Sequence, residues 1–350
     1  MDKTILVFGE RYFHYTSSLA AAFRKLGYKV LEYYYDSFKR DKLSVIQYIK
    51  YKFNKAEFVD GFYEKQRQDL LKFLKNNEID RFVSNNGNWY YNIVDEEILT
   101  YLRQQEIETS IIYVDAILGC ESVEQNIAVY DKIFVFEPSD VDFIYSKYNK
   151  KAIYLPIGVN EDIFCSTIDC DKKYDVSFLG NATYNRLPVL EKVAKYCFFK
   201  GKSMCVVGKY WNNSNIVKNM ISGWIFKRKY PYLHRYVRNG FLYEKKVAKF
   251  YSESKINLNI HTNIHKSINP RTFEIMGNPN FEICDYRVDA ARLGFMSEKN
   301  IVMYANDEEL LKKIEFYINN DVEREKIAQN GCRLVKERFL YWQLLEPYFN

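Results

Sequence analysis

The sequence lacks the patterns that would assign it to several large classes of protein. No apolar stretch approaches the roughly 18 residues that a membrane-spanning helix needs. The chain enters an apolar strand pattern at Thr4 and shows no signal-peptide core before it. Its seven cysteines form no Cys-x-x-Cys pair and no zinc-finger spacing with histidine. We therefore expect a cytoplasmic protein with reduced thiols that is not integral to the membrane.

Strong charge of one sign is also missing. Lysine and arginine together number 51 against 45 acidic residues, which leaves a net charge of +6. This mild excess suits an anionic substrate or an anionic membrane surface, whereas nucleic-acid-binding domains are far more basic. The basic residues are also spread through several segments, so we expect no nucleic-acid partner.

Short apolar runs alternate with helical patterns in two successive blocks. In the first block we expect strands at 4–8, 28–35, 81–84, 110–115, 132–136 and 152–155, with helices that include 64–76 and 98–105. In the second block we expect strands at 175–179, 203–207, 256–260, 281–284 and 300–304. Strands that alternate with helices predict doubly wound parallel sheets, whose ligands bind at the carboxyl ends of the strands.

We therefore predict an α/β protein with two Rossmann-like domains and a cleft between them. Residues 1–160 form the first domain, 161–173 a linker and 174–335 the second domain, while 336–350 form a tail that packs back on the first domain. A chain of 350 residues lets each domain bury a core of its own. The loop after the first strand has no G-x-G-x-x-G pattern, which argues against a dinucleotide site.

A basic, amphipathic segment lies between Phe38 and Phe62. Its apolar residues recur every three to four positions at Leu43, Ile46, Ile49 and Phe53, among the basic residues Lys39, Arg40, Lys42, Lys50, Lys52 and Lys55. Such a helix fits an anionic membrane surface. A surface helix with a solvated basic face is the commoner arrangement, and the sequence leaves both open.

The most informative stretch runs from Asn257 to Asp285. A strand pattern is followed by a polar loop, by a helix that Pro270 can begin, and by a second strand pattern. A helix N-terminus after a strand favours a bound anion, and Arg271 adds a permanently charged, forked donor there. Glu274 lies one turn further on, on nearly the same face. These residues predict an anion-binding pocket; a salt bridge between Arg271 and Glu274 in an ordinary turn is the alternative.

Several local sequences resemble GT-B glycosyltransferases of the spore-maturation (CgeB-like) and group 1 type. The matching segments are Asp175–Gly180 with Arg186, 241–259, Asn269-Pro-Arg-Thr-Phe-Glu274, 301–304 with 307–310, and the helix with Arg324, Ala328 and Gly331. The turn from Leu155 to Asn160 is similar to the interdomain turn of that family. The resemblance is specific over 150–340 and only topological over 1–150.

The resemblance implies GT-B architecture and metal-independent transfer of a sugar, with no cofactor, from a nucleotide-sugar donor to a glycan, lipid-linked or protein acceptor. In the matching motif the Glu274 carboxylate would accept hydrogen bonds from the ribose hydroxyls. Gly180 and Asn181 match the loop that faces the diphosphate. The expected donor site comprises Gly180, Asn181, Arg186, His261, Asn269, Arg271, Thr272, Phe273 and Glu274.

Two features depart from the family pattern. Retaining relatives carry a second glutamate eight positions before the ribose-binding one, and here that position is Lys266. Lysine can bind phosphate but cannot replace a carboxylate beside the sugar. The small-residue segment that follows the motif is changed to Gly277-Asn-Pro-Asn280. The stereochemistry, the base, the sugar and the acceptor therefore stay open.

Two residues of the first block are candidates for catalysis. His14 lies in the loop after the first strand, where many inverting GT-B enzymes place their base, and histidine titrates near neutral pH. Packing against Tyr12 or Tyr15 is the alternative. Asp115, at a strand end, could orient His14 or the acceptor; otherwise it caps a helix. His261 and His265 are four residues apart but lie in a strand end and a loop, so we expect no metal site.

Two other functions remain open. A sugar-nucleotide epimerase of GT-B architecture would need further acid and base groups near the sugar. A non-catalytic sugar-nucleotide-binding or scaffold protein is the second alternative, favoured by the altered Lys266 position.

Overall fold

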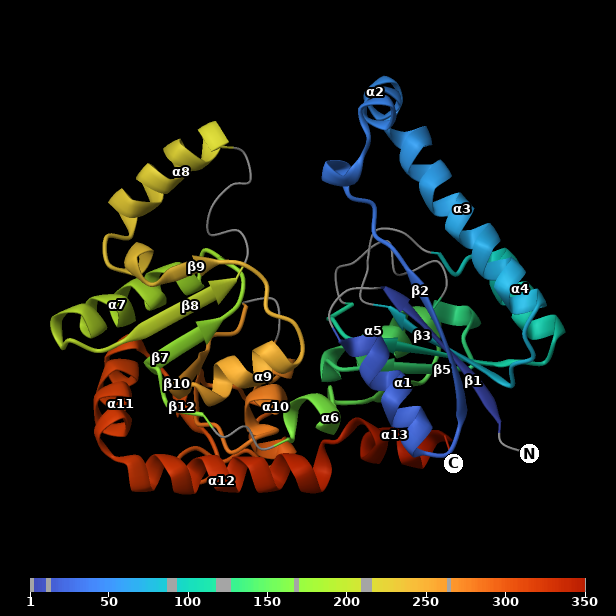
Figure 1. The fold of residues 1–350 in the computed structure, drawn as a ribbon. Helices are drawn as coiled ribbons and strands as arrows, with labels where there is room; N and C mark the ends of the chain where they lie inside the picture. Colours follow the sequence, from blue (N-terminus) through green and yellow to red (C-terminus); the bar gives the residue numbers. More distant parts are fainter. Residues whose placement is uncertain are drawn as a thin grey trace. The chain divides into compact units, whose positions relative to one another are not determined.

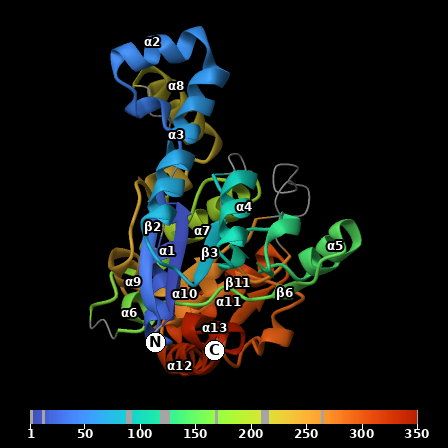
Figure 2. The same ribbon diagram turned by 90° about the vertical axis from the view of Figure 1, so that its right-hand side faces the viewer.

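The chain forms two compact units in the computed structural model, which describes residues 3–10, 14–86, 93–117, 127–166, 170–208, 216–262 and 266–349. The first unit comprises Met1–Pro156 with Tyr341–Asn350, and the second comprises Ile157–Leu340. Figures 1 and 2 show the elements of both from two directions. No described helix is long and apolar enough to cross a membrane.

The first unit is built on a six-stranded parallel sheet with the strand order β2-β1-β3-β4-β5-β6. Its strands are β1 (Thr4–Glu10), β2 (Lys29–Tyr35), β3 (Arg81–Asn86), β4 (Glu108–Tyr113), β5 (Lys132–Val135) and β6 (Ala152–Tyr154). Its helices are α1 (Tyr15–Lys25), α2 (Val45–Phe53), α3 (Lys55–Lys75), α4 (Glu96–Gln104), α5 (Pro138–Tyr148) and α13 (Tyr341–Phe349). Short 3₁₀ turns lie at Arg40–Lys42 and Ile127–Val129.

Buried apolar strands and one-sided helices form the core of this unit. The residues of β1 from Thr4 to Gly9 are buried, as expected for a central strand of a parallel sheet covered on both faces. The helices bury one side each: α1 buries Leu19 and Phe23, and α4 buries Ile98 and Leu102. The sheet therefore forms as the apolar pattern predicts.

The second unit has a six-stranded parallel sheet with the order β12-β11-β10-β7-β8-β9. Its strands are β7 (Tyr174–Leu179), β8 (Met204–Gly208), β9 (Val237–Asn239), β10 (Ser254–Asn259), β11 (Glu282–Asp285) and β12 (Val302–Tyr304). Its helices are α6 (Glu161–Phe164), α7 (Arg186–Phe199), α8 (Ile216–Lys229), α9 (Lys245–Ser252), α10 (Pro270–Met276), α11 (Asp307–Asn319) and α12 (Asp321–Arg338). Short 3₁₀ turns lie at Leu233–Arg235 and Ala291–Leu293.

Strands β7, β10 and β11 are neighbours, and they place the candidate site. Because they are parallel, the loops that follow them leave the sheet at the same edge. The core beneath them is apolar and fully buried, with Val176, Phe178 and Leu258 among its members. Three loops that are distant in the sequence are thereby brought together.

The chain passes between the two units at two connections, one after Pro156 and one after Leu340. Residues 161–173 were predicted as a linker, but α6 forms there because the Asn160 side chain caps it and Phe164 is buried in the second unit. Residues 336–338 still belong to α12, and the chain joins the first unit from Tyr341 onward.

Candidate functional site

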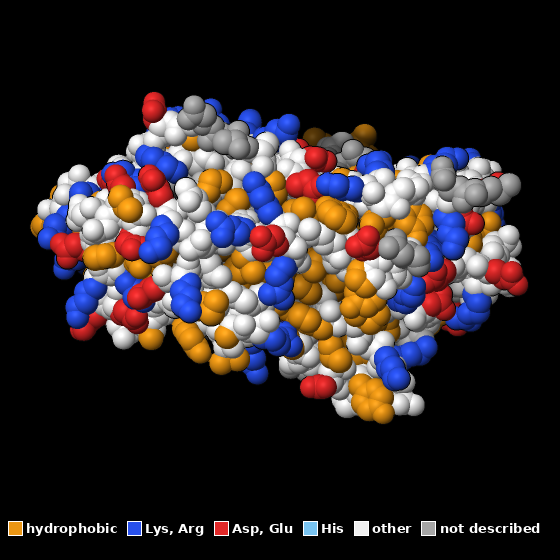
Figure 3. Space-filling view, turned by 90° about the horizontal axis from the view of Figure 1, so that it is seen from below, with side chains coloured by type: hydrophobic (Ala, Val, Ile, Leu, Met, Phe, Trp, Pro, Cys, Tyr) orange, Lys and Arg blue, Asp and Glu red, His pale blue; other side chains and the backbone are white. Residues whose placement is uncertain are grey.

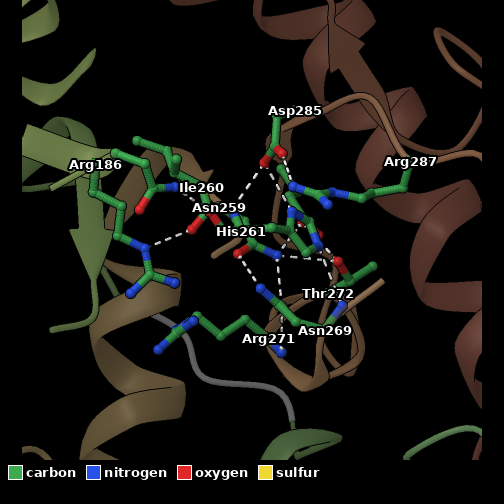
Figure 4. Close-up of polar contacts among 11 residues, drawn as sticks. Arg186, Asn259, Ile260, His261, Asn269, Arg271, Thr272, Asp285 and Arg287 are labelled. Carbon is green, nitrogen blue, oxygen red and sulfur yellow. Dashed lines mark hydrogen bonds and ion pairs between the residues drawn. The ribbon is translucent and has the colours of Figure 1, made fainter. Parts of the chain in front are cut away.

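Gly180, Arg186 and Arg271 meet at the carboxyl edge of the second sheet. Gly180 directly follows β7, Arg186 begins α7 and Arg271 lies in the first turn of α10. A Cβ built on Gly180 would stand 3.0 Å from the Phe178 ring and 3.3 Å from a terminal nitrogen of Arg271, so glycine avoids crowding both groups. Figure 4 shows the guanidinium groups of Arg186 and Arg271 extending toward each other.

The Arg186 side chain is buried and fixed by backbone oxygens. Its Nε donates a hydrogen bond of 2.7 Å to the Ile260 carbonyl, and a terminal nitrogen donates one of 3.2 Å to the Asn181 carbonyl. The guanidinium group also lies over the Phe178 ring, 5.5 Å from its centroid. Burial and then the charge of Arg271 lower the pKa of Arg186 to about 9. The side chain is therefore held in place in an environment that disfavours its charge.

Neither guanidinium group has an acidic partner in the described part of the chain. No ion pair among the described residues includes Arg186 or Arg271, so none joins Arg271 to Glu274. The salt bridge considered as an alternative for this turn is therefore not formed. Two nearby positive charges, one of them buried, are costly unless an anion compensates them. The geometry suits a ligand with several negative charges.

His261, predicted as a donor contact, uses both ring nitrogens within the protein. Its Nδ1 lies 2.8 Å from Asp285 Oδ1, and its Nε2 lies 3.2 Å from the backbone nitrogen of Asn269. Because the Asn269 N–H must donate, Nε2 accepts and Nδ1 carries the proton that it donates to Asp285. Burial lowers the pKa of His261 to about 4, which keeps the ring neutral. The ring thus holds the start of α10.

Asp285 anchors this arrangement at the end of β11. Its Oδ1 also accepts from the backbone nitrogen of His261, and its Oδ2 pairs with Arg287. Although burial acts against the charge, the hydrogen bond from His261 and the positive charge of Arg287 lower the pKa of Asp285 to about 2. A charged carboxylate therefore joins the ends of β10 and β11 (Figure 4).

A second buried network holds the first turn of α10. Asn259 and Asn269 exchange side-chain hydrogen bonds of 2.9 Å, and Asn269 Oδ1 also accepts from the backbone nitrogen of Arg271. Glu282 Oε1 accepts from Asn259 and from the Thr272 hydroxyl, both at 2.8 Å. The Arg271 N–H is thereby occupied. The arginine side chains, more than the helix N-terminus that the sequence indicated, are therefore the groups that can bind an anion.

The remaining motif residues point in different directions. Thr272 and Phe273 are buried; the Phe273 ring packs 5.0 Å from Phe339 and belongs to the core. Glu274 is nearly buried, and its Oε2 accepts a 3.3 Å hydrogen bond from the Tyr251 hydroxyl. Thr272 and Phe273 therefore support the helix, whereas Arg271 and Glu274 offer the charged groups.

The two residues predicted to be catalytic belong to the first unit. His14 is buried at the start of α1, with Nδ1 3.1 Å from the Ser18 hydroxyl and its ring 4.9 Å from that of Tyr15. Asp115 is half-buried in a bend after β4. Both follow the carboxyl ends of strands, and β3 lies between β1 and β4. The structure thus places them at the same edge of the first sheet.

Two further sequence predictions concern Lys266 and a possible metal site at His261 and His265. Lys266 is exposed, and His265 lies outside the described residues. Within the described ranges, no three His, Cys, Asp or Glu side chains gather as a metal site would require.

Four members of the site were not predicted from the sequence, namely Asn259, Glu282, Asp285 and Arg287. A signal was present for the first two, because a polar side chain inside an apolar strand must find a buried partner. No sequence pattern indicated that Asp285 would bind His261, 24 positions earlier.

Comparisons with known proteins relate the chain to one family model and to several solved structures. Residues 189–349 match a family model described as glycosyl transferase-like. No curated protein sequence matches the chain. Among solved structures, sucrose-phosphate synthase from Thermosynechococcus elongatus is similar with a TM-score of 0.64 and 12% identity, over 99% of this chain and 97% of that one.

Two further structures are similar over nearly the whole chain. HepE from Anabaena, in complex with UDP-glucose, has a TM-score of 0.60 and 10% identity over 98% of this chain and 97% of its own. A proposed UDP-N-acetylglucosamine 2-epimerase from Listeria monocytogenes has a TM-score of 0.54 and 9% identity over 99% of this chain and 94% of its own. These similarities show that the fold is GT-B, as predicted.

Proposed function

We propose that this protein is a glycosyltransferase that transfers a sugar from a nucleoside diphosphate donor without a metal ion. One observation carries the proposal. The guanidinium groups of Arg186 and Arg271 lie close to each other and to Gly180, and neither has an acidic partner among the described residues. A diphosphate would supply the missing negative charge. The match of residues 189–349 to a glycosyl transferase-like model supports the same assignment.

The two arginines would also serve the reaction. When the bond between the sugar and the diphosphate breaks, negative charge grows on the leaving group. Fixed positive groups in a buried site stabilise that charge without reorganising, which is the role that a metal ion plays in other transferases. Arg186 is already held by two backbone carbonyls, so it costs little entropy to position.

The other candidates have distinct roles in this proposal. Glu274 accepts hydrogen bonds from the ribose hydroxyls, and Asn181 lines the diphosphate together with Gly180. Asn269, Thr272 and Phe273 position the helix start, and His261 acts through Asn269. His14 takes the proton of the acceptor hydroxyl, while Asp115 orients His14 or the acceptor. The acceptor in this proposal is a glycan, a lipid-linked precursor or a protein. The enzyme itself acts at the inner face of an anionic membrane.

A thermal-shift panel tests the donor site. UDP, GDP, CDP, dTDP and ADP would be added, each with a chelator, to the wild type and to the variants Arg271→Gln and Glu274→Gln. A ligand that binds only the folded state increases the free energy of unfolding, by about 2.7 kcal/mol at a hundred times its Kd, and so raises the melting temperature. We expect one nucleotide to stabilise the wild type and neither variant.

Arg235→Gln is the matched control, because it removes an exposed arginine of the same unit outside the site. It should keep the full shift. If none of the five nucleotides at millimolar concentration stabilises the wild type, the donor assignment is wrong and the scaffold alternative gains. Exchange of the sugar C2 proton in deuterated water, without transfer, would identify an epimerase instead.

A further inference from the structure

Helix α2 exposes an apolar face, formed by Val45, Ile46, Ile49 and Phe53. Their exposed fractions are 77%, 70%, 50% and 88%, and no residue of α2 is buried. At 3.6 residues per turn these four positions fall within about a 100° sector of the helix. An apolar face this open is costly in water, which indicates that something covers it.

The opposite side of α2 is the side that attaches it to the first unit. Tyr51 packs against Phe38 and Phe58, with ring centroids 5.5 and 6.0 Å apart. In Figures 1 and 2, α2 lies at the end of α3 that is remote from the strands of its unit. The apolar face therefore points outward because the helix is fixed by its other side.

Both ends of α2 are capped. Ser44 and Gln47 form a capping box at the first turn, and Asn54 ends α2 while its side chain caps α3. The helix is thus already formed when its apolar face is uncovered, so docking does not include the free-energy cost of folding the helix.

Basic side chains border the apolar face. Lys50 and Lys52 flank it on either side, and neither forms an ion pair with a described residue. The sequence of α2 contains no acid, and Asp41 is the one acid from Phe38 to Asn54. Further basic residues precede and follow the helix at Lys39, Arg40, Lys42 and Lys55. By contrast, basic and acidic side chains are interspersed on the face that Figure 3 shows.

We propose that α2 lies in the surface of an anionic lipid bilayer, with its apolar face among the acyl chains and its lysines at the lipid head groups. This inference rests on the proposed function and deepens it by naming the surface that brings the protein to the membrane. Apolar insertion and attraction to anionic head groups are each weak, and together they hold a helix reversibly at the interface.

A bilayer explains the face better than a protein partner does. Nine helical residues bury far less than the roughly 800 Å² per partner of a stable protein interface. A second copy of the chain would also bring the same lysines together, and like charges repel. An anionic bilayer is complementary to both the apolar and the basic residues.

Vesicle flotation of the full-length protein tests the proposal. The vesicles consist of phosphatidylcholine alone or mixed with phosphatidylglycerol. The wild type should float with the mixed vesicles, less so at high salt, and Val45→Glu with Phe53→Glu should lower that binding at least about tenfold. Lys50→Gln with Lys52→Gln should weaken binding and flatten its salt dependence.

The matched control is Phe316→Glu with Val322→Glu. These side chains are also exposed on helices, and the double change alters size and charge identically. The control should bind as the wild type does. Equal vesicle binding by the control and the α2 variant would overturn the proposal, as would a wild type that fails to float.

Two further measurements separate this inference from its alternatives. Light scattering without vesicles gives the oligomeric state; a wild-type dimer that Val45→Glu with Phe53→Glu dissociates would show that α2 is an interface between copies and overturn the proposal. The nucleotide-induced shift in melting temperature should be unchanged in every α2 variant. Vesicle binding without any nucleotide shift would instead refute the donor site and leave the membrane surface standing.

Discussion

Glu282 is one of two residues whose protonation couples the candidate site to pH; His261 is the other. Its carboxyl group is fully buried in β11, where Oε1 accepts from Asn259 and Thr272 and Oε2 has no hydrogen-bond partner among the described residues. Burial raises the pKa of Glu282 from its ordinary 4.5 to about 7. Between pH 4.5 and about 7 the folded protein therefore keeps a proton on Glu282 that the unfolded chain has already released. Its contribution to stability is complete below pH 4.5 and is lost as the pH rises through 7.

Glu282→Gln removes this dependence while keeping the acceptor oxygen. We expect the free energy of unfolding of the variant to exceed that of the wild type progressively from about pH 4.5 to about 7, by an amount on the order of 3 kcal/mol at the upper end. Urea unfolding at several pH values measures the difference. Glu325→Gln on the exposed face of α12 is the control and should show no such trend. A constant difference between wild type and Glu282→Gln would contradict the assignment.

His261 acts in the opposite direction over part of the same range. Its folded-state pKa of about 4 lies below the ordinary 6.5, so the unfolded chain binds a proton first as the pH falls. Stability that depends on a neutral His261 is present above pH 6.5 and is lost toward pH 4. The wild-type profile contains both contributions, which is why the difference between variant and wild type is the informative quantity.

Only part of the candidate site can be predicted from the sequence. Arg271 and Glu274 belong to one short motif, and their chemistry alone suggests a charged ligand. Glu282 and Asp285 act on residues 10 to 24 positions earlier, through the register of β10 and β11. A sequence pattern shows that these strands form but not which side chains they bring together.

Among the elements, α10 depends on a close approach to α6. A Cβ on Gly277, at the end of α10, would stand 2.8 Å from the Phe164 carbonyl oxygen and 2.9 Å from the Phe164 Cβ. Phe164 is itself buried, and its backbone cannot move aside cheaply. We expect Gly277→Ala to lower the free energy of unfolding by about 1–3 kcal/mol through overpacking, as measured by urea unfolding.

Gly223→Ala is the contrasting change. Gly223 lies inside α8, and no described atom stands within 4 Å of the added Cβ. Alanine should therefore stabilise this helix by roughly 0.5–1 kcal/mol, because glycine loses more backbone freedom on folding. If both alanines had the same sign of effect, steric contact with Phe164 would not be the reason for glycine at 277.

Helices and strands are predicted correctly where the apolar pattern of the segment itself indicates them. The apolar strands and the helix α4 lie within a few residues of their predicted positions. The helix expected from Glu64 begins nine residues earlier, at Lys55, because Asn54 caps it. Strand β9 has three residues, two of them exposed, and gains its place only by pairing with β8. Such short elements depend on tertiary contacts that a local pattern does not contain.

At the scale of the whole molecule, the chain begins in one unit and returns to it at its end. After the second unit, α13 packs beside α1 in the first unit (Figure 1). The sequence suggests a returning tail through its aromatic residues but not its contacts. Phe349 is fully buried, with its ring 4.8 Å from Phe23 and 5.7 Å from Phe134. Its carbonyl oxygen accepts a 2.7 Å hydrogen bond from Arg81.

The first unit is therefore completed by a helix that follows the second unit in the sequence, and this predicts separable effects. Phe349→Ala should lower the free energy of unfolding of the first unit by about 3–5 kcal/mol, because it leaves a cavity between α1 and β5. Glu346→Ala, an exposed change on the same helix, should stay within about 0.5 kcal/mol of the wild type. Hydrogen exchange resolved by segment measures each unit separately. Because the candidate donor residues all lie in the second unit, nucleotide-dependent protection there should survive Phe349→Ala at low temperature. Its loss would show that the two units do not fold as independently as their separate cores indicate.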